Sequence, residues 1–525
     1  MTTEKKKRKA SAPKLYIRNA THDDVDAIIN LAEKSYQSMP SYPRKMIKAQ
    51  ISNYPEGHFV AVYENDIVGY AAAIRVSGKK CLQPHTWREI TGNGYASTHE
   101  ENGDYLYGYE VFVDPTRRRL RIGQRFYNER KNLCRYLRLK GIVFAGRLPQ
   151  LNKKLKEVKT IENYFELVKQ NKIKDSVLSF QIKNGFELLG YFENYLPYDK
   201  DSLGYASHMI WRNPEHEEMK NIQFSTTNTS TNNGKTTVRV ATIQYGQRSI
   251  KSFEEFKQMV EYYVDVVADY HCDFVLFPEL FTLQLLSIEN EEIPPHEAIM
   301  KMTSYTKELK AFFSKMAMSY NVNIIAGSHP YKNKNDEVQN VAFICLRDGS
   351  VHQQAKIHPT PSEKYWWNIV GGTELAPIQT DCGLIGVLIC FDCEFPELTR
   401  HLVDQGMKIL FVPFLTDERQ GYCRVRYCAQ ARAVENEIYV VMSGAVGNLP
   451  RIKNMDIHYS QSCILTPCDF SFSRDGVAQE TTPNVEMLAM ADLRLDTLVE
   501  ARSSGTVQIL KNRRHDLYSV KWHGK

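Results

Sequence analysis

The 525-residue chain has no long apolar run. A membrane-spanning helix needs about 18 consecutive apolar residues, and no stretch of the sequence approaches that length. The basic N-terminus is followed by Ser11, Ala12 and Pro13 rather than by the hydrophobic segment of a signal peptide. We therefore expect a protein without a membrane partner that stays in the cytoplasm.

The chain has few cysteines and a small net charge. The 11 cysteines are scattered without regular spacing, and a reducing compartment keeps such residues as thiols. The formal net charge of +6 is small for this length and does not by itself indicate a nucleic-acid partner. Basic and aromatic residues do not interleave over any long face, so we expect no such partner. A nucleic-acid module built from the basic tail and residues 117–121 stays an alternative.

Lys5 to Lys9 form one basic block near the N-terminus. Such a block is typical of a solvated basic tail, and it also occurs as a nuclear localisation signal. We predict that residues 1–14 form a disordered basic tail, with a nuclear location as the alternative to a cytoplasmic one.

Residues 213–236 are polar and rich in Thr, Asn and Ser, with almost no apolar side chain to bury. Such a composition is typical of a linker. The segments on either side, 15–212 and 237–525, share no internal repeat, and each has its own alternation of strands and helices. The chain is also longer than one ordinary core accommodates. We therefore predict two unlike α/β domains.

The first domain is predicted to begin with a short strand from Leu15, followed by a helix that Thr21 caps. The apolar face of this helix consists of Val25, Ile28, Ile29 and Ala32. Two apolar strands follow around a turn at residues 64–66, and a further strand leads into the stretch "TRRRLRIGQRFYNERKNLC". A basic, glycine-containing turn between a strand and a helix collects free backbone N–H groups and the positive end of a helix dipole. We therefore predict an anion site at this turn.

This order of elements, with "VFVDPTRRRLRIGQRFY" in its middle and "SFQIKNGFELLGYF" near its end, resembles the GNAT family of acetyl-CoA-dependent N-acetyltransferases. In that family a turn of the pattern R/Q-x-x-G-x-G/A binds the pyrophosphate of coenzyme A. Arg118 matches the first position and Gly123 the last, whereas Arg121 stands where the first glycine is expected. The resemblance implies acetyl-CoA as a co-substrate, bound by Arg118, Arg119, Arg121, Ile122 and Gly123.

Acetyl transfer also requires a general base that deprotonates the acceptor amine. Glu110, on the strand just before the basic loop, is the best-placed carboxylate of the domain. A partly buried, structural Glu110 is the alternative. The domain would then bind acyl-CoA as a regulatory module without any transfer.

Three buried strands of the second domain are predicted to end at chemically active side chains. "DFVLFPEL" carries Glu279, the second strand of a hairpin that turns at Asp348 and Gly349 delivers Lys356, and "CGLIGVLIC" ends at Cys390. A carboxylate at a buried strand end has its pKa raised toward that of a general base, so it can take the proton of the thiol. The ammonium stabilises a developing oxyanion, together with the backbone N–H that follows the cysteine. These groups suffice for attack on a carbon–nitrogen bond.

The order Glu, Lys, Cys resembles the nitrilase superfamily of carbon–nitrogen hydrolases. The motifs that carry the resemblance are "FPEL", "AKIHPTPSE", "CFDCEFPE" and "QARAVENEIYVV". It implies an αββα sandwich that assembles as a homo-oligomer, a catalytic triad of Glu279, Lys356 and Cys390, and a second glutamate, Glu363, that orients Lys356 or helps to position substrate. It also implies that a small amide or nitrile forms a thioester without any cofactor in this domain. The predicted fold class is a GNAT-like mixed α/β domain followed by a nitrilase-like αββα sandwich.

Cys390 and Cys393 form a C-x-x-C pair, a pattern that also occurs in redox and zinc sites. Zinc would require a second pair, and Cys423 and Cys428 have the wrong spacing, so we expect no metal site. We interpret Cys393 as a small hydrophobic residue beside the nucleophile. Many members of the superfamily have an arginine at the position of Glu394. The carboxylate disfavours an acidic substrate end at this point, or it forms a surface salt bridge.

Overall fold

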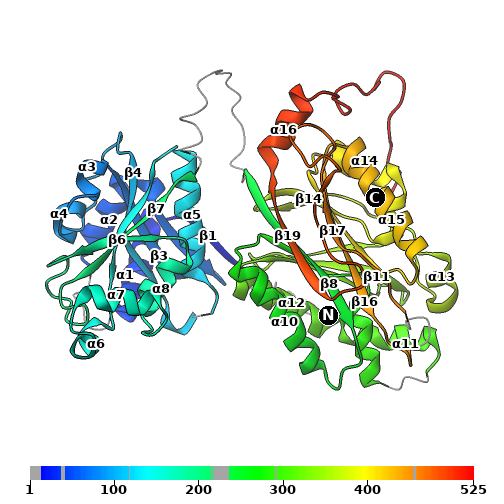
Figure 1. The fold of residues 1–525 in the computed structure, drawn as a ribbon, viewed down its shortest axis with the longest axis horizontal. Helices are drawn as coiled ribbons and strands as arrows, with labels where there is room; N and C mark the ends of the chain where they lie inside the picture. Colours follow the sequence, from blue (N-terminus) through cyan, green and yellow to red (C-terminus); the bar gives the residue numbers. More distant parts are fainter. Residues whose placement is uncertain are drawn as a thin grey trace, which may run out of the picture. The chain divides into compact units, whose positions relative to one another are not determined.

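The computed structural model describes residues 14–36, 42–117, 119–214, 216, 236–289, 293–452 and 457–524. The chain divides into two compact units, one formed by Lys14–Ser230 and the other by the chain from Thr231 onward (Figure 1). All of the predicted tail except Lys14, and the predicted linker except positions 213, 214, 216 and 236, lie outside the described residues. No helix in the described ranges is long and apolar enough to cross a membrane.

The N-terminal unit is built on a seven-stranded sheet with the order β1-β2-β3-β4-β5-β7-β6. Neighbouring strands run antiparallel except for β4 and β5, which are parallel. The strands are β1 (Leu15–Asn19), β2 (His58–Tyr63), β3 (Asp66–Val76), β4 (Tyr105–Val113), β5 (Gly141–Arg147), β6 (Glu187–Phe192) and β7 (Ala206–Arg212). The helices are α1 (Val25–Ser35), α2 (Arg44–Asn53), α3 (Gly78–Cys81), α4 (Trp87–Thr91), α5 (Ile122–Tyr136), α6 (Leu151–Val158), α7 (Ile161–Lys169) and α8 (Ser176–Lys183).

Helix α1 follows a capping box made by Thr21 and Asp24, as the sequence predicts. Its buried residues are Val25, Ile28, Leu31 and Ala32. The predicted Ile29 lies only partly buried at the edge of this face. The apolar stripe is therefore shifted slightly around the helix, because Leu31 rather than Ile29 completes it.

Strands β4 and β5 are paired over a short stretch only, from Tyr105 opposite Gly141 to Gly108 opposite Phe144. The far half of β4 is bonded to β3 alone. Gly108 is required here, because a Cβ at this position would lie 2.8 Å from the guanidinium of Arg130. That buried guanidinium donates hydrogen bonds of 2.6 Å to two backbone carbonyls, those of Ala72 and Glu110. The half of β4 that lacks β5 as a neighbour is thus supported from the side of α5.

The C-terminal unit contains a twelve-stranded sheet whose main path is β12-β11-β10-β9-β8-β16-β15-β14-β13. Strand β19 joins β8, and β17 and β18 follow on from β16. The strands are β8 (Thr237–Gln247), β9 (Phe274–Leu276), β10 (Asn323–Lys332), β11 (Val338–Cys345), β12 (Val351–Ala355), β13 (Ile378–Thr380), β14 (Gly383–Val387), β15 (Ile409–Phe414), β16 (Tyr439–Gly447), β17 (Cys463–Leu465), β18 (Val477–Glu480) and β19 (Met487–Arg494). The helices are α10 (Phe253–Asp269), α11 (Pro295–Met302), α12 (Thr306–Tyr320), α13 (Pro361–Trp367), α14 (Pro396–Asp404), α15 (Arg419–Glu435) and α16 (Leu495–Ser504).

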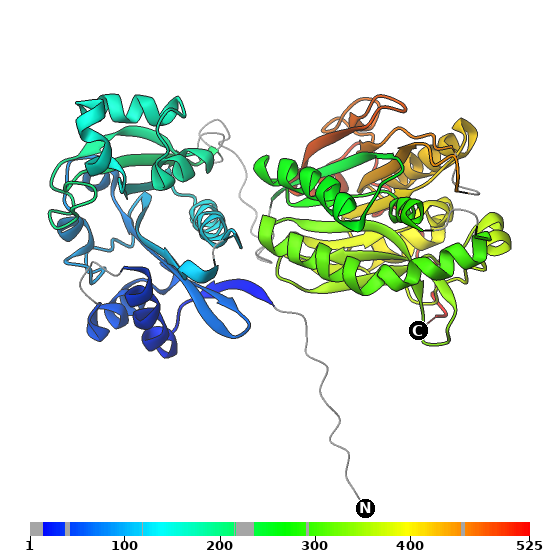
Figure 2. The ribbon, with the colours of Figure 1, turned by 90° about the horizontal axis from the view of Figure 1, so that it is seen from below.

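This sheet is folded into two layers at β8, which pairs with β16 only through Tyr245–Gln247. The inner faces of the layers pack on each other, and the rings of Phe274 on β9 and Phe411 on β15 lie 5.2 Å apart between centroids. Helices α10 and α12 cover one outer face of the sandwich, and α14 and α15 cover the other. Figure 2 shows the molecule from below, with α10 and α12 toward the viewer. The predicted αββα sandwich is confirmed.

Two predicted strand ends are wrong. Strand β9 ends at Leu276 rather than at Glu279. Strand β14 ends at Val387 rather than at Cys390. The backbone N–H of Leu388 still donates to the carbonyl of Phe411 at 3.0 Å, so the chain stays extended for one more residue. Cys390 then begins the 3-10 helix η7 (Cys390–Glu394) with a φ of 48°. The nucleophile candidate therefore lies on a sharp turn beyond the strand, in a left-handed conformation that costs energy for any residue except glycine.

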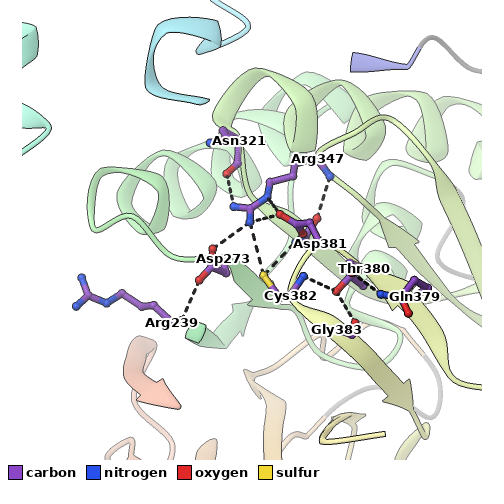
Figure 3. A network of polar contacts seen from close by, with 10 residues as sticks. Arg239, Asp273, Asn321, Arg347, Gln379, Thr380, Asp381, Cys382 and Gly383 are labelled. Carbon is purple, nitrogen blue, oxygen red and sulfur yellow. Dashed lines mark hydrogen bonds and ion pairs between the residues drawn. The ribbon is translucent and has the colours of Figure 1, made fainter. Parts of the chain in front are cut away.

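An ion-pair network in which Asp273 is buried and Asp381 is half exposed joins the two layers at one end of their strands (Figure 3). The guanidinium of Arg347, after β11, donates to Asp273 before β9 at 3.1 Å and to Asp381 before β14 at 2.7 Å. Asn323 on β10 donates to Asp381 at 3.0 Å and accepts the N–H of Arg347 at 2.9 Å. The two carboxylates keep the pKa of Arg347 above its usual value although burial opposes this. The network therefore fixes the start of β9 relative to the start of β14.

We expect Arg347→Leu to destabilise the C-terminal unit by about 3 kcal/mol, because it leaves the buried carboxylate of Asp273 without its charged partner. Urea denaturation followed by hydrogen exchange of peptides from β9 and β14 measures this loss. Arg514→Leu is the matched control, since Arg514 pairs with Asp516 on the surface and its removal should not change the unfolding midpoint. Equal midpoints for the two variants would show that the network does not join the layers.

Candidate active site

Three charged side chains meet in the interior of the C-terminal unit, and one of them, Glu279, is 77 positions away from Lys356 in the sequence. The ammonium of Lys356 donates to Oε1 of Glu279 at 2.8 Å and to Oε2 of Glu363 at 2.6 Å. All three side chains are buried, and Lys356 is only 1% exposed. An ammonium so far from water is tolerated only when paired charges and hydrogen bonds replace its hydration.

Two members of this cluster, Lys356 and Glu279, follow the ends of strands. Lys356 comes directly after β12, and its backbone N–H donates to the carbonyl of Asn340 on β11 at 2.8 Å. Glu279 follows β9, where the left-handed Leu280 turns the chain and donates its N–H to the hydroxyl of Ser328 at 3.1 Å. The hydrogen-bonded sheet therefore fixes the positions of both side chains.

Glu363 lies in the first turn of α13, and its carboxylate has two kinds of partner. Its Oε2 accepts the backbone N–H of Thr360 at 2.7 Å, and the Thr360 hydroxyl accepts the backbone N–H of Glu363 at 3.2 Å. This capping box satisfies the N-terminus of the helix. The same carboxylate is therefore a helix cap and the second partner of Lys356.

Cys390 completes the site from the turn after β14. The thiol is 5% exposed and lies 3.7 Å from the carbonyl oxygen of Leu415. Cys390 is the first residue of η7, so the backbone N–H of Phe391 belongs to the first turn of this helix, directly after the thiol-bearing residue. The neighbouring thiol also lowers the pKa of the Glu279 carboxyl, although burial outweighs this effect.

Buried polar contacts fix the loop that carries Cys390. The carboxylate of Asp392 accepts the backbone N–H groups of Ile357 and His358 at 2.9 and 2.8 Å, which joins the cysteine loop to the residues just after Lys356. From α15, Arg432 donates to the carbonyls of Cys393 and Glu394 at 3.0 and 3.3 Å. Two charged side chains therefore determine where the thiol lies.

The pKa values of the two carboxylates in the cluster are shifted in opposite directions. Burial raises the pKa of Glu279, and the ammonium of Lys356 only partly offsets this. Burial also opposes ionisation of Glu363, yet Lys356 and the hydrogen bonds from Thr360 and Asn340 hold its pKa below the usual value. Glu363 is thus the permanent counter-ion of Lys356, and Glu279 is the carboxylate that can exchange a proton.

Burial and the neighbouring Glu279 also raise the pKa of the Cys390 thiol well above its usual value. An isolated thiol of this kind is unreactive at neutral pH. It becomes a nucleophile only if an adjacent base takes its proton. The arrangement of thiol, carboxylate and ammonium supplies a nucleophile, a base and a positive charge at one point.

Asn340 on β11 is a member of the cluster that the sequence analysis does not identify. Its Nδ2 donates to Oε1 of Glu279 at 2.8 Å and to Oε1 of Glu363 at 2.9 Å. The only sequence signal is a polar amide within the apolar strand "VQNVAFIC", on the inward face that Ala342 and Ile344 also occupy. Such an amide is more commonly a core residue with local partners.

The second cysteine of the C-x-x-C pair points away from the charged cluster. The Cys393 thiol is fully buried against α15, 3.9 Å from the carbonyl of Val425, and it belongs to the core between the layers. Its neighbour Glu394 forms an ion pair of 2.9 Å with Arg424 of α15. The salt-bridge alternative for Glu394 is therefore the one that the structure contains.

The basic loop of the N-terminal unit is described apart from Arg118, which lies outside the described residues. Arg119 and Arg121 have φ values of 78° and 47°. Arg121 therefore adopts the left-handed conformation for which the family pattern uses glycine, as the N-cap of α5. Ile122 and Gly123 form the first turn of α5, where the backbone N–H groups of an α-helix have no intrahelical acceptor.

Glu110 lies on the half of β4 that pairs with β3 but not with β5, and it accepts hydrogen bonds from two tyrosines. The hydroxyl of Tyr36 donates at 2.8 Å, and the hydroxyl of Tyr42 donates to the other carboxylate oxygen. Burial raises the pKa of Glu110, and the two tyrosine donors oppose this rise. The carboxylate is therefore positioned, and it has the raised basicity that a general base requires.

Both parts of the chain match known families. Residues 239–503 match the carbon-nitrogen hydrolase family, and residues 25–155 match the acetyltransferase (GNAT) family. Over 509 residues the chain is 44% identical to "Probable hydrolase YhcX" of Bacillus subtilis (strain 168), and the alignment covers 97% of each chain. The N-terminal part is 32% identical over 205 residues to "Uncharacterized N-acetyltransferase YkwB" of the same organism, covering 38% of this chain and 89% of that protein.

The C-terminal part is also 28% identical over 202 residues to "Deaminated glutathione amidase" of Synechocystis sp. (strain PCC 6803 / GT-S), which covers 36% of this chain and 71% of that protein. A crystal structure of a carbon-nitrogen hydrolase from Helicobacter pylori G27 aligns with a TM-score of 0.46 and 20% identity over 54% of this chain and 97% of that chain. Both family resemblances predicted from the motifs are confirmed by the family matches and the full-length relative. The chain belongs to the carbon-nitrogen hydrolase family and carries an N-terminal acetyltransferase domain of the GNAT family.

Proposed function

We propose that the C-terminal unit hydrolyses the carbon–nitrogen bond of a small amide through a thioester on Cys390. The observation that supports this most directly is the contact of Lys356 with both Glu279 and Glu363 at 2.8 and 2.6 Å beside a buried thiol. A nitrile is the alternative substrate. An amide is favoured because a relative of the C-terminal part is named an amidase.

Formation of the thioester begins with proton transfer from the Cys390 thiol to Glu279. The thiolate then attacks the carbonyl carbon, and the oxyanion that develops receives the positive charge of Lys356 and the backbone N–H of Phe391. When the tetrahedral intermediate collapses, the carbon–nitrogen bond breaks and the nitrogen leaves with the proton from Glu279. Glu363 orients Lys356 throughout, because its own pKa is kept low.

Hydrolysis of the thioester repeats these steps with water. Glu279, again unprotonated, takes a proton from the water, whose oxygen attacks the thioester carbon. The carbon–sulfur bond breaks, the carboxylic acid leaves, and the thiolate regains its proton from Glu279. Homo-oligomer formation through the C-terminal unit and a cytoplasmic location of this reaction remain predictions from the sequence.

The N-terminal unit is proposed to bind acetyl-CoA at the loop that leads into α5. Arg119, Arg121 and the first-turn N–H groups of Ile122 and Gly123 supply the donors that a pyrophosphate requires. Gly123 keeps this turn compact, since a Cβ there would lie 3.2 Å from the ring of Phe180. Acetyl-CoA would supply the acetyl group, and Glu110 would take a proton from the acceptor amine.

We expect Cys390→Ala to reduce release of ammonia or amine from amide substrates by at least about 10⁴-fold, because no nucleophile remains. Cys393→Ala is the matched control and should retain most of the activity. A screen of amides, nitriles and carbamoyl compounds, with mass-spectrometric trapping of the acylated Cys390 peptide, makes the measurement. An equally inactive Cys393→Ala together with stoichiometric zinc in the wild type would contradict the assignment.

The acid limb of the pH profile of kcat/KM should lie above the usual pKa of a glutamate. Glu279 acts only when it is unprotonated, and burial raises its pKa, so activity increases as the pH rises through that raised value. Glu279→Gln should remove this limb and lower kcat/KM by about 10²-fold to 10⁴-fold. Glu374→Gln, at an exposed position before β13, should leave the profile unchanged. A limb that persists in Glu279→Gln would assign the base to another group.

We expect the double variant Arg119→Ala, Arg121→Ala to weaken binding of acetyl-CoA by about tenfold or more, since charge-assisted contacts to phosphate are lost. Isothermal titration calorimetry at two salt concentrations measures the effect. Arg117→Ala is the matched control, because the Arg117 guanidinium lies 5.0 Å over the ring of Tyr63 and is engaged there. Equal affinities of the double variant and the wild type would place the phosphates elsewhere.

A second experiment tests whether the N-terminal unit is a transferase or an acyl-CoA-sensing module that regulates the hydrolase. Incubation with acetyl-CoA and a panel of amines should give an acetylated product, and Glu110→Gln should lose the product while it keeps the binding. If acetyl-CoA binds but no amine is acetylated, the sensing module is the correct alternative.

A further inference from the structure

Asn340 has an unusual set of contacts for a core amide. It is fully buried on β11 and touches both carboxylates of the charged cluster through a single nitrogen. Its Oδ1, in contrast, has no hydrogen-bond partner among the residues that the structure describes. A buried carbonyl without a partner costs stability, so the orientation of this amide needs an explanation.

The carboxylates themselves determine that orientation. An asparagine Nδ2 has two hydrogens, and here one is directed to Oε1 of Glu279 at 2.8 Å and the other to Oε1 of Glu363 at 2.9 Å. The flipped amide would place Oδ1 against two oxygen acceptors with no hydrogen between them. The hydrogen-bond network therefore assigns the nitrogen to this side, and the unpaired Oδ1 is the consequence.

A second donor to Oε1 of Glu279 limits which oxygen of that carboxylate can accept a proton. Lys356 also donates to Oε1 of Glu279, at 2.8 Å. Hydrogens of Lys356 and Asn340 thus face Oε1, and a proton on that oxygen would point at one of them. The oxygen that remains for a proton is Oε2.

We propose that Asn340 is a positioning residue that, together with Lys356, directs proton transfer from Cys390 to Oε2 of Glu279. In this step the S–H bond of Cys390 breaks and an O–H bond forms on Oε2, so that a thiol and a carboxylate become a thiolate and a carboxylic acid. The total charge does not change. The inference rests on the proposed hydrolytic function and adds a residue and an oxygen atom to it.

The second hydrogen of Asn340 has a complementary effect on Glu363. Because the amide nitrogen contacts Oε1 of both carboxylates, the two groups do not share one proton through these oxygens. The charged and titratable groups around Glu279 are Lys356, Glu363 and Cys390, and they come from β12, α13 and η7. Asn340 is the uncharged member that touches two of them.

Asn340→Leu and Asn340→Asp in the full-length chain test this role. Cys390 is alkylated with iodoacetamide between pH 4 and pH 9, and peptide mass spectrometry follows its rate apart from the other cysteines. The pH profile of kcat/KM and the thermal unfolding midpoint are measured on the same samples. The alkylation readout does not depend on knowing the natural substrate.

For Asn340→Leu we expect the acid limb of both profiles to move up by about one pH unit, because the Glu279 carboxylate loses a donor that stabilises its charged form. The unfolding midpoint should stay or rise, since the unpaired carbonyl is removed as well. Asn340→Asp adds a third carboxylate and should move the limb further. Gln339→Leu is the matched control, because Gln339 donates to the carbonyl of Gly371 at 3.1 Å instead and should leave the limb in place.

A lower unfolding midpoint with an unmoved acid limb would show that Asn340 serves folding alone and would overturn the inference. If Asn340→Leu does not fold, an unmoved limb in the nearly isosteric Asn340→Asp overturns it equally. If the wild type shows neither amide hydrolysis nor pH-dependent alkylation of Cys390, the proposed hydrolytic function fails first. The two failures are therefore distinguishable.

Discussion

The C-terminal unit depends on one buried ammonium ion. Lys356 is 1% exposed, and its charge is stable there only because Glu279 and Glu363 contact it directly. Since the three residues come from the ends of β9 and β12 and from α13, these elements must keep their relative positions for both contacts to persist. The ion-pair network of Arg347 holds the opposite end of β9 and the start of β14. Two charge clusters therefore define the two ends of the sandwich.

The thiol is placed by a different set of contacts. Asp392 joins the cysteine loop to the residues after Lys356, and Arg432 joins it to α15. Because Cys390 has a positive φ, the loop would relax toward an ordinary conformation if these contacts were absent. Cys393, one turn of the 3-10 helix further on, packs in the core and makes none of the hydrogen bonds of the charged cluster. Of the two cysteines of the C-x-x-C pair, one therefore lies beside the charged cluster and the other packs in the core.

The buried strands and most of the charged cluster can be predicted from the sequence, because both follow from local patterns. Apolar runs predict the buried strands, and the chain order places Glu279, Lys356 and Cys390 after them. Three features cannot be predicted in this way. Asn340 looks like any strand residue, since its role exists only when β11 lies beside both carboxylates. The pairing of Arg347 with Asp273 and Asp381 joins residues 74 and 34 positions apart. The left-handed backbone of Arg121 and Cys390 contradicts residue preferences and is imposed by the surrounding fold.

The double task of Glu363 has a consequence for how the site responds to its surroundings. Its carboxylate satisfies the N-terminus of the seven-residue helix α13 and also neutralises Lys356. Unwinding the first turn of α13 would therefore remove a counter-ion from a buried ammonium, and a change in the charge of the cluster would in turn change the stability of the helix. Local folding and ionisation are linked functions here. A molecule that bound α13 and altered its first turn would act as an effector of the hydrolase without touching Cys390.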